Sequence, residues 1–457
     1  MRESNSAEEF LTQLRHAQEI LDSGFARLPQ APAEPLGDDA AQVLDEVAER
    51  LRDNDPYQHP LYAGQMLKPP HPIARAAYAL AMSLNPNNHA LDGGRASSAM
   101  ELEAVAALAR MFGWGEHLGH LTSGGTFANL EALWVAGQLH PDRAIAASDQ
   151  AHYTHSRISA AVLRVPFVPI PTDEHGRMDL VALEEALATK QIGTVVATLG
   201  TTAIGAVDPL DRILELRSRY QFRVHVDAAY GGYFTLARNL QASARAALNA
   251  VARVDSLVID PHKHGLQPYG CGCVLFRDPG VGRFYKHDSP YTYFTSKQLH
   301  LGEISLECSR PGAAAVALWA TQRLLPYVPG GTFARGLEAG REAALGLRTK
   351  LATDARFIVP AAEPELDIVF WAVSGATTAE SSARARAIFE EARKRDLYLA
   401  LAELPARFFP AGSWGRAPMQ AAHVTCLRSV LMKAEHKLWL EEIWSRLLDA
   451  ASAVWPP

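Results

Sequence analysis

Four short segments of the sequence carry side chains that could do chemistry together. The first, TSGGT at residues 122–126, places small residues directly before a predicted helix. Backbone N–H groups and hydroxyls at the positive end of a helix form a good binding site for phosphate. A capped helix with a flexible glycine turn is the other interpretation of this segment taken alone. The candidate phosphate ligands are Ser123, Gly124, Gly125 and Thr126.

The second and third segments each place a polar side chain after an apolar run. Asp227 ends RVHVD and is followed by small residues such as Ala229, which suits a planar cationic ring, although an Asp that begins a turn is an equal alternative. Lys263 follows SLVID, and a lysine with apolar or cationic neighbours can form a Schiff base, although most loop lysines are solvated charges. Metal binding by His262 and His264 is a competing interpretation, but no third ligand is evident nearby, so we expect no metal site.

The fourth segment, ASDQAHYTHSR, places His152 a few residues after a predicted strand. From there its ring could lie flat on a bound heterocycle, and a structural histidine is the alternative. The order of the segments connects them, because a phosphate loop, a histidine, a carboxylate and a lysine all follow strands of one α/β unit. A planar cofactor with a phosphate, a ring nitrogen and an aldehyde would use all four. We therefore expect pyridoxal 5′-phosphate as the cofactor.

The elements that must position these residues alternate between strand and helix over about residues 101–276. The β-rich runs IAAS, TVVATLG, RVHVDAAY, SLVID and CVLF are separated by runs with helical spacing, such as FANLEALWVAGQL and DLVALEEALAT. This alternation predicts βαβ units and a mostly parallel sheet, at whose carboxyl edge ligands bind. We expect an N-terminal helical segment at 1–60, a large domain that binds the cofactor at 61–328, and a small α+β domain at 329–457.

Composition excludes several classes of protein. Of the 457 residues, 48% are hydrophobic and 21% charged, so the chain is globular and not disordered. The formal net charge of −6 disfavours nucleic-acid binding. No apolar run approaches ~20 residues, and the start MRESNSAEEF lacks the features of a signal peptide. Four cysteines without a CxxC pair argue against a disulfide scaffold and structural zinc, so we expect a cytoplasmic enzyme without a membrane span.

Taken together, these segments resemble the group II pyridoxal-phosphate-dependent amino-acid decarboxylases, which include aromatic-amino-acid, glutamate, tyrosine and cysteine-sulfinate decarboxylases. The resemblance is carried by HPLYAGQM, TSGGTFANLEAL, SDQAHYTHS, VATLGTT, HVDAAYGG and DPHKHG and, more loosely, by ECSRPGAAAVALW and CLRSVLM. These stretches follow the family's order over about residues 59–431. The resemblance implies fold type I (aspartate aminotransferase-like), a homodimer with the active site at the interface, and α-decarboxylation of an L-amino acid to an amine and CO2.

The resemblance also implies a role for each candidate residue. Lys263 would hold the cofactor as a Schiff base, Asp227 would pair with the protonated ring nitrogen, and His152 would stack on the ring. Tyr291 or Tyr293, in the stretch HDSPYTYFTSK, would protonate the product carbon. The remaining cofactor contacts would come from Ser123, Gly124, Gly125, Thr126, Thr201 or Thr202, Ala229 and His262.

Substrate contacts implied by the resemblance are Gln65, in AGQM, and Arg428, in CLRSVLM. The stretch NHALDGGRASS departs from the aromatic branch, and its His89 favours a polar or acidic substrate, with a solvated loop as the alternative. Other activities stay open: a carbon–carbon lyase of the aldehyde-lyase type, and a transaminase or aldehyde synthase that depends on decarboxylation. A degenerate homologue without activity is disfavoured, because Lys263, Asp227 and His152 are costly polar groups to keep without a cofactor.

Overall fold

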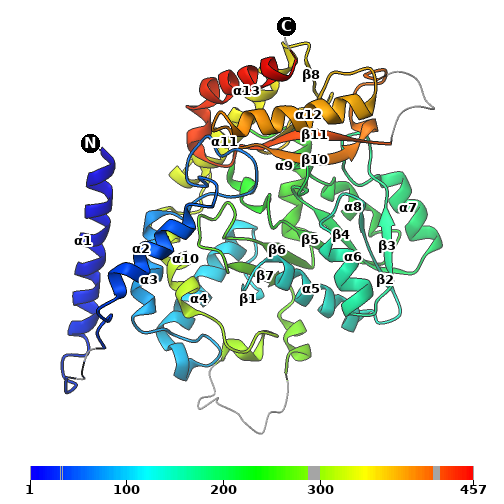
Figure 1. The fold of residues 1–457 in the computed structure, drawn as a ribbon. Coiled ribbons are helices and arrows are strands. Elements are labelled where there is room, and N and C mark those ends of the chain that lie inside the picture. Colours follow the sequence, from blue (N-terminus) through cyan, green and yellow to red (C-terminus); the bar gives the residue numbers. More distant parts are fainter. Residues whose placement is uncertain (1, 31, 33, 287–298, 415–421, 456–457) are drawn as a thin grey trace.

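The chain folds around two β-sheets that lie in different parts of the molecule (Figure 1). The larger sheet occupies the middle of the body, and the smaller sheet lies with the C-terminal helices at the top of the view. Tyr291 and Tyr293 lie outside the described residues. The computed structural model describes residues 2–30, 32, 34–286, 299–414 and 422–455.

Seven strands from the described part of the chain form the large sheet, in the order β1-β7-β6-β5-β4-β2-β3. Strand β7 is antiparallel to its neighbours β1 and β6, whereas the pairs from β6 to β3 are all parallel. All residues of β2, β4, β6 and β7 are buried, so both faces of the central sheet are covered. The strands are β1 (Leu118–Thr122), β2 (Ala144–Ser148), β3 (Phe167–Ile170), β4 (Ile192–Thr198), β5 (Arg223–Asp227), β6 (Ser256–Ile259) and β7 (Gly272–Phe276).

Helices connect these strands in the alternating pattern that the sequence predicts. A short turn of π-helix, η1 (Ile158–Val162), directly follows α6. The helices of this part are α4 (Leu91–Met111), α5 (Gly125–Leu139), α6 (Thr154–Arg157), α7 (Leu180–Thr189), α8 (Leu210–Leu216), α9 (Ala242–Ala250) and α10 (Gly312–Leu324).

The expected α/β fold with a mostly parallel sheet is confirmed. Two of its strands, β1 and β3, were not predicted from the sequence. Both are edge strands, since within the described part of the chain β1 pairs only with β7 and β3 only with β2. Their sequences, LGHLT and FVPI, carry a buried His120 and an exposed Pro169 in place of continuous β-branched residues. A proline is tolerated at a sheet edge, where one side of the strand needs no partner.

The small sheet is antiparallel throughout, in the order β10-β11-β9-β8. The sequence predicted β9 and β11 and missed the short β8 and the partly exposed β10. The boundaries proposed above at residues 328 and 329 stay a prediction. The elements are α11 (Thr332–Ala352), β8 (Phe357–Ile358), β9 (Ile368–Val373), α12 (Thr378–Arg393), β10 (Ala400–Pro405), β11 (His423–Val430) and α13 (Leu440–Val454).

The N-terminal part of the chain contains α1 (Arg2–Ser23), α2 (Ala40–Leu51) and α3 (Pro72–Met82). Helices were expected within residues 1–60, where α1 and α2 lie, and the boundary at residue 60 stays a prediction. Helix α1 stands at one side of the molecule and packs along α3, where Arg75 lies over the ring of Phe10 at 5.1 Å (Figure 1). Helix α2 buries none of its side chains. Across the described ranges, none of the helices combines the length and the apolar character that crossing a bilayer requires.

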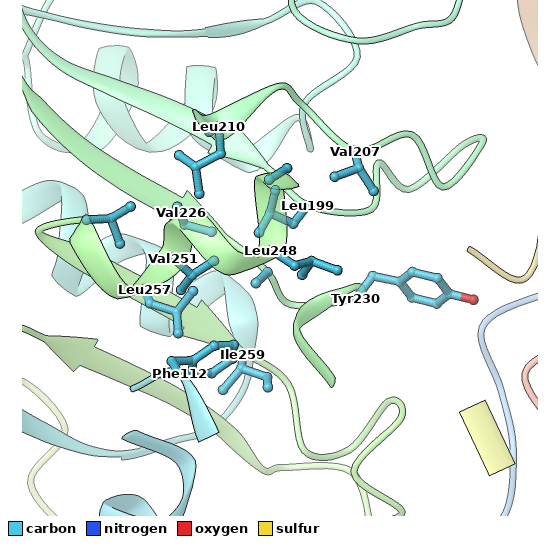
Figure 2. Close-up of a cluster of buried hydrophobic side chains, with 14 of the residues drawn as sticks. Phe112, Leu199, Val207, Leu210, Val226, Tyr230, Leu248, Val251, Leu257 and Ile259 are labelled. Carbon is cyan, nitrogen blue, oxygen red and sulfur yellow. The ribbon is translucent and has the colours of Figure 1, made fainter. Parts of the chain in front are cut away.

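The main apolar core packs against the central strands of the large sheet. Figure 2 shows part of it, in which Val226 of β5, Leu257 and Ile259 of β6 and Leu210 of α8 belong to one cluster. Leu257 is fully buried. This core fixes the positions of strands β4, β5 and β6, so it also fixes the residues that follow their carboxyl ends.

We predict that Leu257→Ala lowers the free energy of unfolding by about 2–5 kcal/mol, because it removes buried methyl groups and leaves a cavity. Chemical denaturation of the protein without added ligands measures this change. The matched control is Leu438→Ala, whose side chain is 84% exposed and whose loss should change stability by less than about 0.5 kcal/mol. Equal effects of the two substitutions would contradict the packing described for this core.

Candidate active site

A cavity of about 420 Å³ lies where five strands of the large sheet end. Its wall is formed by residues at or after the carboxyl ends of β1, β2, β4, β5 and β6, and its volume suits a small organic molecule. The structure thus brings together the four segments that the sequence singled out. The wall consists of Ser123, Gly124, Gly125, Thr126, Phe127, Asn129, His152, Thr198, Gly200, Thr202, Asp227, Ala229, Tyr230, Asp260, His262 and Lys263.

The glycine-rich segment lies at the N-terminus of α5, as the sequence predicts. Gly124 is the N-cap residue and Gly125 begins the helix. A Cβ atom at Gly125 would lie 2.6 Å from Oδ2 of Asp260, so only glycine lets these two segments approach so closely. The N–H of Ser123 donates to Oε2 of Glu307 at 3.1 Å. The positive end of α5 therefore faces the cavity with little side-chain bulk in front of it, which suits an anion.

Asp227 ends β5 as a buried carboxylate with three N–H donors. His155 Nε2 lies 2.8 Å from Oδ2, Asn129 Nδ2 donates to Oδ2 at 3.4 Å, and the backbone N–H of Ala229 donates to Oδ1 at 3.1 Å. Burial alone would raise the pKa of Asp227, but the hydrogen bond and charge of His155, with the charge of Lys263, hold it well below its ordinary value. Asp227 is therefore ionised at neutral pH and can pair with a cationic group in the cavity.

Lys263 is anchored by a carboxylate that the sequence analysis did not single out. Its Nζ atom lies 3.1 Å from Oδ2 of Asp260, and Nε2 of His262 lies 3.5 Å from the same oxygen. Burial lowers the pKa of His262, whose ring lies tilted by 34° against the ring of Tyr269, with centroids 4.9 Å apart. Lys263 therefore reaches the cavity beside a buried negative charge, and its amine lies in the same wall as Asp227.

His152 and the residues after β4 form further parts of the wall. Burial lowers the pKa of His152, and Asp227 and Lys263 act on it in opposite directions. The imidazole is therefore neutral near pH 7. Of the two candidate threonines, Thr202 lines the cavity, whereas Thr201 is fully buried and its hydroxyl accepts the N–H of Ala206 at 3.0 Å.

The three predicted substrate contacts lie outside this wall. Arg428 donates from Nη1 to Oε1 of Gln65 at 3.2 Å, and from Nη2 and Nε to the carbonyls of Thr202 and Ala203 at 2.7 Å each. The guanidinium thus holds the loop that carries Thr202. His89 packs against Gly302, whose N–H donates to its carbonyl at 2.9 Å. Roles for these residues in substrate binding stay a prediction.

The cavity wall fits the cofactor expected from the sequence. Thr198 Oγ1, Asp260 Oδ1 and His262 Nδ1 are buried, and none of them has a hydrogen-bond partner among the described residues. Such atoms need polar partners. An ionised carboxylate, an amine and a helix N-terminus also match, respectively, the ring nitrogen, the aldehyde and the phosphate of pyridoxal 5′-phosphate. Asp227, Lys263 and the segment from Ser123 to Thr126 would hold these three groups.

Several residues of this site were not predicted from the sequence. Asn129 lies within the first turns of α5, so helical spacing from Gly125 could have placed it on the cavity side. His155 follows His152 by three residues and contacts Asp227 without lining the cavity. Asp260 precedes Lys263 by three residues in DPHK. No sequence signal connects Asn129 to His225, whose Nε2 lies 2.9 Å from the amide oxygen and whose Nδ1 lies 2.9 Å from Ser256 Oγ.

We predict that His225 makes the fold sensitive to acid. Burial, with a contribution from His155, lowers the pKa of His225 to about 3 in the folded state. The unfolded chain then binds the extra proton, so this part of the stability is complete above about pH 6.5 and is lost as the pH falls toward 3. Between pH 7 and pH 5 the loss is about 2 kcal/mol for one such histidine.

Urea denaturation of each variant at pH 7 and pH 5 measures this loss. His225→Gln should reduce the difference between the two pH values by about 2 kcal/mol. His16→Gln, at an exposed position of α1, should leave the difference unchanged. An unchanged difference in His225→Gln would show that the pKa of this imidazole in the fold is close to its ordinary value, which contradicts the prediction.

Comparisons with known proteins show which family the sequence resembles. A model of the family described as the pyridoxal-dependent decarboxylase conserved domain matches residues 36–373. An L-tyrosine decarboxylase of Enterococcus faecium is 30% identical over 63% of this chain, and an L-2,4-diaminobutyrate decarboxylase of Acinetobacter baumannii is 28% identical over 63%. The matched parts are 64% and 62% of those proteins, so the chain spans less than two thirds of their length.

Solved structures with the same fold cover nearly the whole chain. Mouse CSAD in apo form has a TM-score of 0.75 and 21% identity, and the match covers 97% of this chain and 99% of that one. Oryza sativa TDC with PLP and tryptamine has a TM-score of 0.77 and 19% identity, over 98% and 96% of the two chains. These likenesses confirm the expected fold of type I. Because the family model also covers well over half of the sequence, this protein belongs to the pyridoxal-dependent decarboxylase family.

Proposed function

We propose that this protein removes the α-carboxylate of an L-amino acid as CO2 and releases the amine, with pyridoxal 5′-phosphate as cofactor. The main support for this proposal is that Asp227, Lys263 and the N-terminus of α5 lie in the wall of one cavity. The family relationship supports the cofactor and the class of reaction. Since the chain spans less than two thirds of its first relatives, the activity itself is our proposal.

The cofactor supplies a conjugated ring that takes up the electrons left when CO2 departs. The residues of this chain supply the other interactions that the reaction needs. Ionised Asp227 would keep a proton on the ring nitrogen of the bound cofactor, because the pKa of Asp227 lies far below that of a pyridine. The N-terminus of α5 would bind the phosphate, and neutral His152 would offer an uncharged ring surface. Lys263 Nζ, held by Asp260, is an amine that can bind the aldehyde carbon.

The class of substrate is open among amino acids with acidic, basic and aromatic side chains. The relatives include an L-tyrosine, an L-2,4-diaminobutyrate and an L-aspartate decarboxylase, the last from Thermococcus kodakarensis. We propose Gln65, Arg428 and His89 as groups near the substrate, and Tyr291 or Tyr293 as the donor of the final proton. The contact of Arg428 with the cavity is indirect, because Arg428 holds the loop that carries Thr202.

We predict that the purified protein binds pyridoxal 5′-phosphate, is yellow, and releases amine and CO2 from one class of L-amino acid. Lys263→Ala should lose at least 1,000-fold in turnover, on the order of other losses of a covalent catalytic group, and should lose the absorbance band that borohydride removes from the wild type. A panel of acidic, basic and aromatic L-amino acids scored for amine and CO2 gives the substrate.

The same panel tests the alternative activities. Aldehyde or keto acid without amine would identify an aldehyde synthase or a transaminase that depends on decarboxylation, and cleavage of a carbon–carbon bond without CO2 would identify an aldehyde-lyase type enzyme. A protein that stays colourless in excess cofactor would contradict the proposal as a whole. Val181→Ala, at a 69% exposed position of α7, is the control and should behave as the wild type.

We also propose that the protein is a homodimer, held in part by α2, and that it acts in the cytoplasm, as expected from the sequence. On α2, Val43, Leu44, Val47 and Leu51 follow the spacing i, i+1, i+4 and i+8, so they form one apolar stripe. These side chains are 47–62% exposed. An amphipathic helix normally buries such a stripe, and a second copy of the chain is the partner that a symmetric enzyme provides.

We predict that the wild type sediments with twice the 49.7 kDa mass of one chain. Val47→Glu, which places a charge in the stripe, should raise the dissociation constant of the dimer at least tenfold, since an unpaired buried charge costs more than about 1.4 kcal/mol. Gln42→Glu adds the same charge on the opposite face of α2 and should leave the dimer intact. A wild-type monomer, or equal effects of the two variants, would contradict this assembly.

A further inference from the structure

His155 makes the shortest hydrogen bond to the carboxylate of Asp227 in the cavity wall. It lies on α6, one turn after His152, and the N–H of His155 donates to the carbonyl of His152 at 3.1 Å. Its side chain is fully buried, and its Nε2 lies 2.8 Å from Oδ2 of Asp227. The other ring nitrogen, Nδ1, is buried and has no hydrogen-bond partner within the described residues. The ring therefore has one polar contact of its own, and that contact is Asp227.

The neighbouring hydrogen bonds require Oδ2 of Asp227 to accept from Asn129. Ser256 and Asn129 bond the two ring nitrogens of His225 at 2.9 Å each. Because burial keeps His225 neutral, one nitrogen accepts and the other donates. With Asn129 Oδ1 accepting from His225, the amide nitrogen is left to donate to Asp227 at 3.4 Å. This contact is long, so His155 supplies the main side-chain donor to the carboxylate.

Removing the His155 donor would leave Asp227 with the weak contact from Asn129 and one backbone N–H. The carboxylate is only 5% exposed, and burial without donors favours its protonated form. A protonated Asp227 could no longer attract a proton on a ring nitrogen. The charged and titratable groups around this position are Asp227 and His225 on β5, His152 on the preceding loop, and Lys263 and Asp260 after β6.

We propose that His155 is a positioning residue for the cofactor: its Nε2–H holds Asp227 in the ionised state and orientation that bind a protonated ring nitrogen. The inference rests on the proposed function, because it needs pyridoxal 5′-phosphate as the ligand. His155 does not line the cavity itself, so it acts through Asp227. It is thus distinct from His152, whose ring forms part of the wall.

The experiment compares two ligands that differ only in the ring nitrogen. These are pyridoxal 5′-phosphate and its 1-deaza analogue, in which a carbon replaces that nitrogen. Dissociation constants are measured by equilibrium dialysis with apoprotein, so no turnover is involved. The wild type should bind pyridoxal 5′-phosphate at least tenfold more tightly than the analogue, because only the former can pair with Asp227.

His155→Phe should reduce this preference at least threefold toward unity, mainly by weakening the binding of pyridoxal 5′-phosphate. His155→Gln, whose amide N–H can still reach the carboxylate, should keep most of the preference. His155→Leu is measured in parallel, so that the comparison survives if the phenylalanine variant does not fold. A general packing defect would weaken both ligands equally and leave their ratio unchanged.

The matched control is His120→Phe, which breaks another buried pair of histidine and carboxylate. His120 Nε2 lies 3.0 Å from Glu131 Oε2, and both side chains are fully buried, but neither contacts Asp227. This variant should keep the wild-type ratio. A wild-type ratio in His155→Phe and His155→Leu would overturn the inference, whereas a wild type that binds neither ligand would overturn the proposed function instead.

Discussion

The structure of the site depends on one buried negative charge, the carboxylate of Asp227 at the end of β5. A carboxylate with 5% exposure would be neutral unless hydrogen-bond donors and positive charges offset the loss of water. Here the donors come from three places in the chain: α6 with His155, α5 with Asn129, and the backbone after β5. The environment of Asp227 is therefore built by elements that are far apart in the sequence, and their relative positions determine which donors reach this carboxylate.

The charges around the cavity are arranged to match a ligand that is positive at one end and negative at the other. Asp227 provides the negative end of this arrangement, and the N-terminus of α5 provides the positive end. Lys263 would add a free positive charge between them, but Asp260 lies 3.1 Å from it and offsets that charge. The buried Asp260 also faces Gly125 closely, so the absence of a side chain there is a condition for the whole arrangement.

The small sheet helps to hold the lysine loop in place. His264, next to Lys263, has its Nε2 2.8 Å from Oδ2 of Asp367, and Tyr230 Oη donates to Oδ1 of the same carboxylate at 2.5 Å. Burial alone would raise the pKa of Asp367, but His264 and Tyr230 keep it below its ordinary value. Arg428 on β11 likewise holds the loop of Thr202. Asp367 and Arg428 thus hold loops of the cavity in place through buried polar contacts, although neither residue lines the cavity.

From the sequence alone, the kind of fold and the main chemical groups could be determined. Strands and helices alternate with clear periodicity, and parallel strands must end at one edge, so Asp227, Lys263, His152 and the glycine loop were expected to meet. Edge strands and the partners of buried charges depend on contacts between distant segments. His155, Asp260 and the chain from Ser256 through His225 to Asn129 therefore emerged only from the tertiary structure. The periodicity of a segment predicts which face of a helix or strand is buried. Which residue that face contacts is determined by the tertiary packing.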